Sequence, residues 1–364
     1  MEKMNEYLSK KISFLSMISM IAVVFIHAYN YTDTFLQPHT LITEGLHPIA
    51  CIQYAISNAL TRFAVPVFFM ISGFLFFFGK EFGASFYAKQ LKKRCRSVLS
   101  VFVIFSVISF AVCHLVFSFT GEGVIGMIDE RITKNLLYVL FQNPFAFQLW
   151  FLAQLFIMSI VSPICYFLIK KLGVVFPIIL ACLWIFDKHL VVGGYTLFNS
   201  DAYMFFTLGA YIAIKKPCLK MLYEKTESAK PLIASLVSWI SVAVAYTLFS
   251  ATAEESSVIQ LLMFKLVVLL GIITVWLLYD RLSVRIVEHP VTKAVSENNF
   301  TVYLLHEPLL HIIFMSTLTH FNADIVHVLL YFVLPILIIL LCAYIGKILR
   351  SKLPRFNAVI TGGR

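Results

Sequence analysis

The stretch ISFLSMISMIAVVFIHAYNY, residues 12–31, contains no Asp, Glu, Lys or Arg. A helix of about twenty such residues is long enough to cross a bilayer. The stretch carries one histidine, His27, and an imidazole inside a membrane span is costly unless it meets water, a partner or a substrate. Because histidine transfers protons near neutral pH, His27 makes this chain a candidate membrane enzyme.

The composition extends this pattern to the whole chain. Hydrophobic residues make up 60% of the 364 positions and charged residues only 13%, against about 25% charged in soluble domains. We therefore expect an all-α, polytopic integral membrane protein that forms a single domain over residues 1–364. Hydropathy predicts about ten transmembrane helices, at residues 12–31, 59–79, 97–119, 148–168, 174–192, 201–215, 229–251, 259–279, 300–319 and 325–349.

The positive charges predict the orientation. If the N-terminus is cytoplasmic and the ten spans alternate, 24 of the 29 Lys and Arg residues fall on the cytoplasmic side. Cytoplasmic loops carry an excess of Lys and Arg, so both termini are predicted to be cytoplasmic, in the inner (cytoplasmic) cell membrane. The net charge of +10 is thus an orientation signal with some attraction to membrane lipids, and a nucleic-acid partner is not expected.

The seven cysteines are scattered, with no CxxC pair and no metal-ligand spacing. We expect neither a disulfide framework nor a metal site.

Several costly polar residues lie near the outer ends of predicted spans. Besides His27, they include Arg62, His114, Gln148, Trp150 and Lys265. Their shared depth predicts one polar cavity that opens outward, because isolated charges at that depth are penalised. The alternative is structural: Arg62 and Lys265 would extend to the outer headgroups, and Trp150 would belong to an aromatic belt.

A second polar pair interrupts the ninth span. His306 and Glu307 precede Pro308, about one to two turns from the predicted cytoplasmic end. Adjacent helical residues point about 100° apart, so the pair is not a catalytic dyad; one member is expected to face the interior as a substrate-binding residue. The alternative is a proline kink with a hydrogen bond.

The basic segment 80–96 allows two interpretations. Its apolar and basic residues would lie on opposite faces of a helix, which is typical of an amphipathic helix at the cytoplasmic interface. The other interpretation is a site for a polyanionic ligand, in which Lys93, Arg94 and Arg96 bind phosphates.

Four stretches resemble one family. They are FLSMISMIAVVFIHAYN (14–30), RFAVPVFFMISGFLFF (62–77), QLWFLAQLFIMSIVSPI (148–164) and NNFTVYLLHEPLLHIIF (299–314). In this order they look like the membrane acyltransferase-3 family, whose O-acyltransferases modify cell-surface glycans and lipids. The resemblance implies a donor, usually acetyl-CoA, with no permanently bound cofactor. It also implies an acceptor hydroxyl on an extracytoplasmic or lipid-linked glycan or lipid.

The resemblance places family motif residues at His27, Arg62, Ser72, Gly73, Trp150 and His306, and the family's basic run at Lys92 to Arg96. Three positions depart from the family pattern. Ser16 stands where members often carry Arg, and Ala153 and Gln154 stand where related members often carry Arg-Asp. Shifted donor or acceptor chemistry and loss of activity both remain open.

Acyl transfer to a hydroxyl needs a base and a positive charge near the developing oxyanion. We predict His27 as the base and Arg62 as the cation. Ser72, Trp150, Lys265, His306 and Glu307 are the candidate substrate-binding residues, and Lys93, Arg94 and Arg96 the candidates for coenzyme A. The acyl group reaches His27 either on a pantetheine arm that threads inward or by a relay through His306. The alternative function is a transporter or flippase of an anionic lipid-linked sugar.

Overall fold

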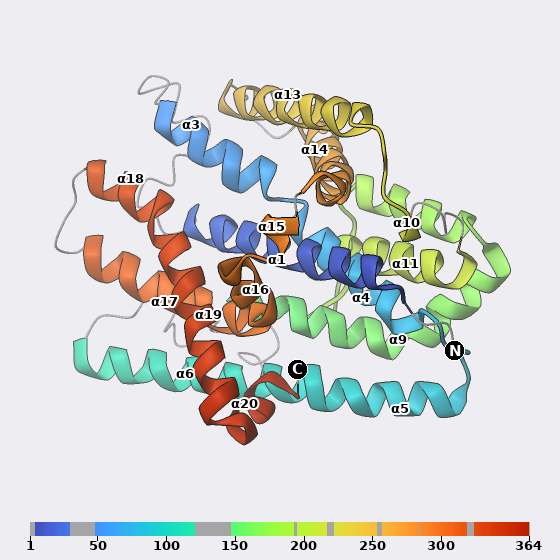
Figure 1. Ribbon diagram of the computed structural model, residues 1–364, viewed down its shortest axis with the longest axis horizontal. Coiled ribbons are helices and arrows are strands. Elements are labelled where there is room, and N and C mark those ends of the chain that lie inside the picture. Colours follow the sequence, from blue (N-terminus) through green and yellow to red (C-terminus); the bar gives the residue numbers. More distant parts are fainter. Residues whose placement is uncertain are drawn as a thin grey trace.

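The computed structural model describes residues 4–29, 48–120, 147–192, 195–216, 222–252, 257–282, 284–318 and 324–363, and these are mostly helical (Figure 1). The helices are α1 (Glu6–Tyr29), α3 (Pro48–Tyr54), α4 (Ala64–Phe77), α5 (Ala84–Arg94), α6 (Ser100–Thr120), α9 (Trp150–Leu172), α10 (Val175–Ile185), α11 (Ser200–Lys215), α13 (Lys230–Thr252), α14 (Val258–Leu278), α15 (Val284–Val287), α16 (Pro290–Glu297), α17 (Asn299–Leu318), α18 (Asp324–Phe332), α19 (Leu334–Lys352) and α20 (Pro354–Thr361). Short π-helical turns cover Ala55–Leu60 and Cys95–Leu99, and 3-10 turns cover Phe147–Leu149 and Tyr279–Arg281.

Six helical segments in the described parts are long and apolar enough to cross a membrane. They are Glu6–Tyr29, Ile49–Phe77, Trp150–Leu172, Lys230–Ala251, Val258–Arg281 and Ile325–Lys352. Each overlaps one of the ten predicted spans. The other four predicted spans overlap α6, α10, α11 and α17, which stand outside that set of six. The chain is therefore a multi-pass membrane protein, and the number of spans and the side of the termini stay predictions.

The structure corrects the all-α expectation at one place. Helix α10 ends at Ile185, so the predicted span 174–192 is too long. Strands β1 (His189–Val192) and β2 (Tyr195–Asn199) follow and pair antiparallel. Asp187 turns the chain after the helix with a positive φ of 51°. Val, Tyr and Thr favour strands, and the Gly-Gly pair between the two runs is the sequence signal for a hairpin that the hydropathy average hides.

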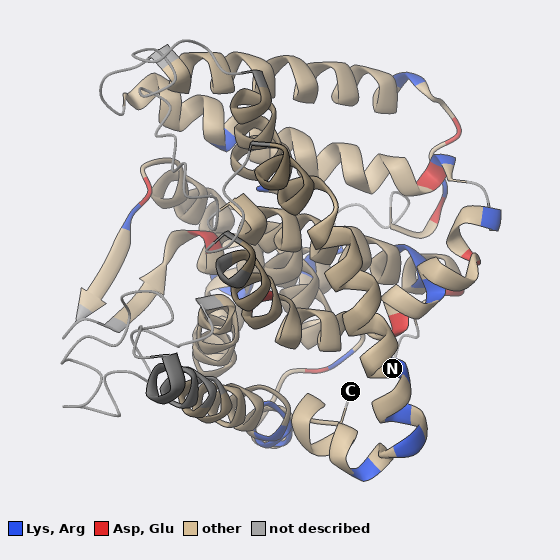
Figure 2. Ribbon diagram, turned by 90° about the vertical axis from the view of Figure 1, so that its left-hand side faces the viewer, with Lys and Arg blue, Asp and Glu red and all other residues tan. Residues whose placement is uncertain are grey.

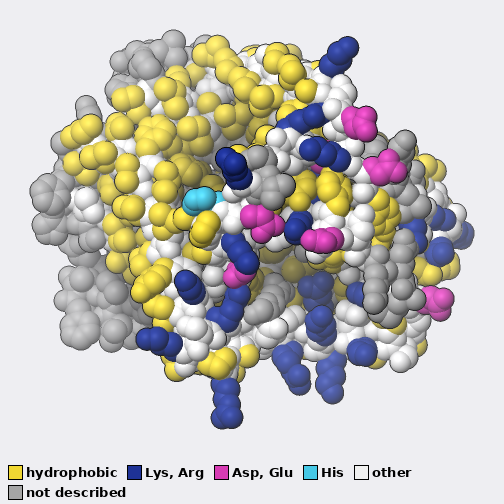
Figure 3. All heavy atoms as spheres, in the orientation of Figure 1, with side chains coloured by type: hydrophobic (Ala, Val, Ile, Leu, Met, Phe, Trp, Pro, Cys, Tyr) yellow, Lys and Arg dark blue, Asp and Glu magenta, His cyan; other side chains and the backbone are white. Residues whose placement is uncertain are grey.

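Apolar side chains cover much of the outer surface. On α13, for example, Ile233, Val237 and Val244 are each about half exposed or more. In Figure 3 hydrophobic side chains spread over the upper left of the molecule. Such an extended apolar surface is typical of contact with lipid and atypical of a soluble protein.

Two glycines let α4 and α11 cross in contact. A Cβ on Gly73 would lie 2.0 Å from the Phe206 carbonyl oxygen, and a Cβ on Gly209 would lie 1.9 Å from the Met70 carbonyl oxygen. Small residues allow this close approach of helix backbones inside membranes. Gly73 of the quoted motif therefore has a packing role.

A buried ion pair anchors the start of α1. Lys11 Nζ lies 2.7 Å from Asp280 Oδ1, and both side chains are inaccessible to solvent. The Lys11 amine also lies 4.2 Å from the centre of the Trp276 ring. Removing one partner would leave a buried charge, so this pair fixes the position of α1 against the end of α14.

The basic segment lies in one long helix. Helix α5 continues through the turn Cys95–Leu99 directly into α6, and Figure 1 shows both along the same edge of the molecule. The segment is thus continuous with a predicted span, and its position at the cytoplasmic interface stays a prediction. In Figure 2 most Lys and Arg segments lie toward the right and lower edges.

Candidate active site

A cavity of about 690 Å³ lies between the helices. One face of α1 lines it, with Ser13, Ser16, Met20, Val23 and His27. These positions recur every three or four residues, which is the spacing of a single helix face. With a rise of 1.5 Å per residue, this wall runs for about 20 Å along α1 and ends at His27.

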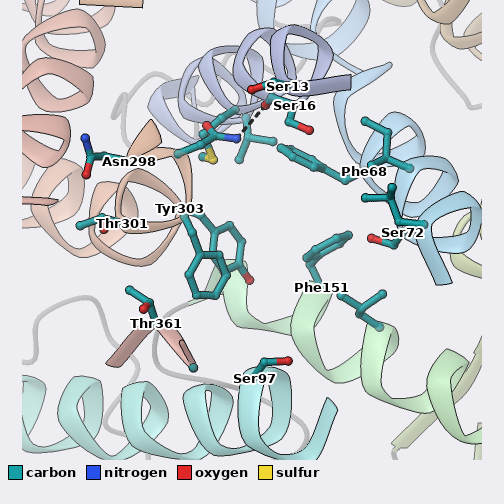
Figure 4. Close-up of a pocket in the computed structure, with 18 of the residues that line it drawn as sticks. Ser13, Ser16, Phe68, Ser72, Ser97, Phe151, Asn298, Thr301, Tyr303 and Thr361 are labelled. Atoms are coloured by element: carbon teal, nitrogen blue, oxygen red, sulfur yellow. Dashed lines mark hydrogen bonds between the residues drawn. The ribbon is translucent and has the colours of Figure 1, made fainter. Parts of the chain in front are cut away.

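Several further elements contribute to the wall. Figure 4 shows the labelled side chains around an open centre: Phe68 and Ser72 from α4, Phe151 from α9, Ser97 from the turn after α5, Tyr303 from α17 and Thr361 from α20. Trp150 also lines the cavity. The structure therefore brings Ser72 and Trp150, two predicted substrate-binding residues, to the same space as His27.

His306 lies beside His27. The two ring centres are 5.1 Å apart, and the ring planes make an angle of 67° in an edge-to-face contact. Nδ1 of His306 lies 3.0 Å from the Val302 carbonyl oxygen and 2.9 Å from the Tyr303 carbonyl oxygen. Carbonyls only accept, so Nδ1 carries the proton and Nε2 keeps a lone pair, for which the described residues offer no hydrogen-bond partner. The sequence predicted that His306 lies near the cytoplasmic end of its span and His27 near the outer end of its own, so that the two would be far apart. This expectation is wrong, because Asn299 at the start of α17 already lies level with Ser16 in the middle of α1.

A second contact holds α17 against the start of α9. The Tyr303 hydroxyl donates to the Gln148 carbonyl oxygen at 2.7 Å, and the Gln148 amide donates to the Leu304 carbonyl oxygen at 3.3 Å. Both Tyr303 and Gln148 line the cavity. These bonds set the ring of Tyr303 into the cavity, where Figure 4 shows it.

Arg62 is not among the residues that line the cavity. Its guanidinium donates to the Asn58 side-chain oxygen, and its charge acts electrostatically on the His27 ring. The described residues hold no carboxylate within ion-pair distance of Arg62 and no hydrogen-bond partner for its Nε atom. The cation is therefore available to stabilise negative charge that develops near His27.

The opposite end of the cavity is basic. Lys93 and Arg94 of α5 line it, together with Lys80 and Arg350. Partial burial and then the positive charges of Lys93 and Arg94 lower the pKa of Lys80. Cations crowded in this way are typical of a site that binds phosphate groups. The space-filling view in Figure 3 shows Lys and Arg side chains gathered on the lower part of the molecule.

Besides Arg62 and His306, three more predicted site residues are not among the described residues that line the cavity. Arg96 is exposed in the π-helical turn Cys95–Leu99, and Glu307 is buried in α17. Lys265 instead pairs with Asp187 at 2.9 Å and lies 4.8 Å from the centre of the Trp184 ring. The predicted single cavity that gathers Arg62 and Lys265 as wall residues is therefore wrong, since equal depth does not fix which way a helix face points.

Two of the three positions that depart from the family pattern, Ser16 and Gln154, make hydrogen bonds to other elements. Ser16 lines the cavity, and its carbonyl accepts a hydrogen bond from the Asn299 amide at 3.0 Å. The amide of Gln154 donates to the Thr196 carbonyl oxygen at 2.7 Å and so ties α9 to strand β2. The side chain of His114 lies outside the described residues, as do most of residues 32–58 and 120–147, the longest loops that we predict on the outer side.

Sequence reasoning missed several wall residues. Lys80, Arg350 and Asn357 line the basic end, and Lys80 is far in the sequence from the other two. Lys80 follows α4, whereas the other two belong to α19 and α20. The signal that could have found Lys80 is its place in the same basic segment as Lys93, and no comparable signal marks Asn357.

A cavity that joins histidines to a cluster of cations inside a helical membrane protein suits transfer of a group from a polyanionic donor. A family model described as an acyltransferase domain matches residues 11–344. This match spans most of the sequence, and the chain belongs to the membrane acyltransferase-3 family. Searches of curated proteins and of solved structures found no significant match. The resemblance drawn from the four motifs is confirmed, and membership in an enzyme family weighs against the transporter alternative.

Proposed function

We propose that this acyltransferase is an O-acetyltransferase of the inner cell membrane. It would move an acetyl group from cytoplasmic acetyl-CoA to a hydroxyl of an extracytoplasmic or lipid-linked glycan or lipid, with residues 1–364 acting as one transmembrane domain. The observation that carries the proposal is the single cavity lined by His27 at one end and by Lys93 and Arg94 at the other.

The continuity of this cavity favours a threaded donor. The 3′-phosphate and diphosphate of coenzyme A would bind the basic end, because Arg and Lys donors suit phosphate oxygens. The pantetheine arm would then extend along the α1 wall toward His27, past Ser72 and Trp150. With such a path, a covalent relay through His306 is unnecessary. Acetyl-CoA acts as a substrate, and no permanently bound cofactor is proposed.

The chemistry follows from the paired histidines. His27 takes the proton of the acceptor hydroxyl as its oxygen attacks the thioester carbonyl carbon. The new C–O bond places negative charge on the carbonyl oxygen, and Arg62 stabilises that charge from its nearby position. The C–S bond then breaks, and the leaving coenzyme A sulfur takes up the proton that His27 accepted, which restores the neutral imidazole. His306 orients the His27 ring through the contact of the two imidazoles.

The test is transfer of radiolabelled acetyl groups from acetyl-CoA into glycan or lipid of a cell-envelope fraction. Loss of a general base typically slows a reaction about 10²–10⁴-fold, so the His27→Ala variant should lose nearly all label. His189→Ala is the matched control, because His189 lies in strand β1 and is not among the cavity residues.

The outcomes separate the parts of the proposal. Label with the wild type and the control, but not with His27→Ala, supports both the reaction and the base. Equal label with all three would remove His27 from the mechanism. No label with any of them would contradict the proposed acetyl transfer and would fit another acyl donor, a lost activity or the transporter alternative.

A further inference from the structure

The C-terminal segment, residues 350–363, takes part in the basic end of the cavity. Arg350, Asn357, Thr361, Gly362 and Gly363 all line it. The acyltransferase family match ends at residue 344, so these five residues lie beyond the matched domain. This chain therefore builds part of its cavity from a segment that the family model does not cover.

The first half of the segment is fixed against the junction of α16 and α17. The Arg350 guanidinium donates to the Glu297 carbonyl oxygen, and Nη1 lies 3.9 Å from Glu297 Oε2. One turn earlier, Gly346 packs on Asn298, where a Cβ would lie 2.8 Å from the side-chain oxygen. Glu297 and Asn298 also line the cavity, so Arg350 is held at its edge.

The second half of the segment packs against the π-helical turn Cys95–Leu99, which follows α5. Gly362 ends α20 with a φ of +66°, and its amide and that of Gly363 cap the helix. A Cβ on Gly362 would lie 2.4 Å from Ser97 Cα and 3.0 Å from the Arg96 carbonyl oxygen. Only glycine suits both this φ and this close approach. The segment thus spans the cavity edge from Glu297 to Ser97.

The side chains that the segment supplies have the chemistry of a nucleotide site. Arg350 is about half exposed and joins Lys80, Lys93 and Arg94 around the same cavity. Asn357 is 7% exposed and offers both a donor and an acceptor there. Arginine pairs with phosphate oxygens, and an amide can pair with the edge of adenine.

We propose that the C-terminal segment is a wall of the subsite for the nucleotide of the donor, with Arg350 on a phosphate and Asn357 on the base. The proposal rests on acyl-CoA being the donor. It predicts that the adenine nucleotide binds here even when no acyl group is present.

The test measures binding of adenosine 3′,5′-bisphosphate to the full-length protein in detergent by calorimetry. Loss of a charged hydrogen bond should weaken binding by about tenfold or more in Arg350→Gln. Arg355→Gln is the matched control, because Arg355 is exposed on the same segment and is not among the cavity residues. Gly362→Ala, which displaces the segment from Ser97 without removing a charge, should also weaken binding.

Tight binding by the wild type and Arg355→Gln, with weak binding by Arg350→Gln, supports the subsite. Equal affinity of Arg350→Gln and Arg355→Gln, or no binding to the wild type, overturns it. The acetyl-transfer assay of the wild type is read separately. Nucleotide binding without acetyl transfer would therefore contradict the proposed reaction and leave the subsite supported.

Discussion

At the scale of the residue, the pKa of Lys80 is lowered by its position among the cations at the basic end of the cavity. Its Nζ donates to the Leu75 and Phe76 carbonyl oxygens at 3.0 and 3.3 Å, where α4 ends. Partial burial and the neighbouring cations lower its pKa. Lys80 therefore loses its proton at a lower pH than an ordinary lysine, whose pKa is about 10.4.

This shift predicts a pH dependence of nucleotide binding. An anion binds the protonated amine, which is present below the lowered pKa and is lost as the pH rises through it. Affinity for adenosine 3′,5′-bisphosphate should thus fall as the pH is raised from about 7 toward 10. Calorimetry at constant ionic strength measures this change of affinity with pH. Lys80→Arg keeps its charge over this range, so identical profiles of this variant and the wild type would contradict the prediction.

At the scale of the element, the crossing of α4 and α11 positions one wall of the cavity. The same helix α4 carries Gly73 on its packed face and Ser72 and Phe68 on the cavity face. Any side chain at Gly73 or Gly209 must push the two backbones apart, and α4 would move relative to α1.

Gly73→Ala and Gly209→Ala should each lower the free energy of unfolding, by about 1–3 kcal/mol or more for such overpacking. The apparent melting temperature of the purified protein in detergent measures the loss. Gly83→Ala is the matched control, because a Cβ there would meet nothing within 4 Å. Equal melting temperatures for all three variants would show that the crossing tolerates a methyl group.

At the scale of the whole molecule, the basic end of the cavity is predicted to face the cytoplasm. Cys95 is exposed beside Arg94 and serves as a natural probe for that side. His189 in strand β1 belongs to the predicted outer side.

A variant that keeps only Cys95 should react with a membrane-impermeant maleimide in inside-out vesicles and not in right-side-out vesicles. A variant that lacks the native cysteines and carries His189→Cys should show the opposite pattern. Labelling of both cysteines from the same side would refute the predicted orientation.

The sequence by itself determined the class of the molecule. Long uncharged stretches such as residues 12–31 identify membrane helices, because the bilayer imposes a length and excludes charge. The ordered motifs around His27, Arg62, Trp150 and His306 identified the family, and the confirmed match over residues 11–344 follows from the same residues. Hydropathy also placed most helices, although it missed the hairpin after α10.

Only the tertiary structure decided which polar residues share a site. Depth along a helix can be counted from the sequence, but the direction of each helix face depends on packing between segments far apart in the chain. That packing pairs Lys265 with Asp187, sets His306 against His27, and brings Arg350 and Asn357 to the cavity that Lys93 and Arg94 line. Long-range contacts of this kind leave no local signal, which is why the cavity had to be read from the structure.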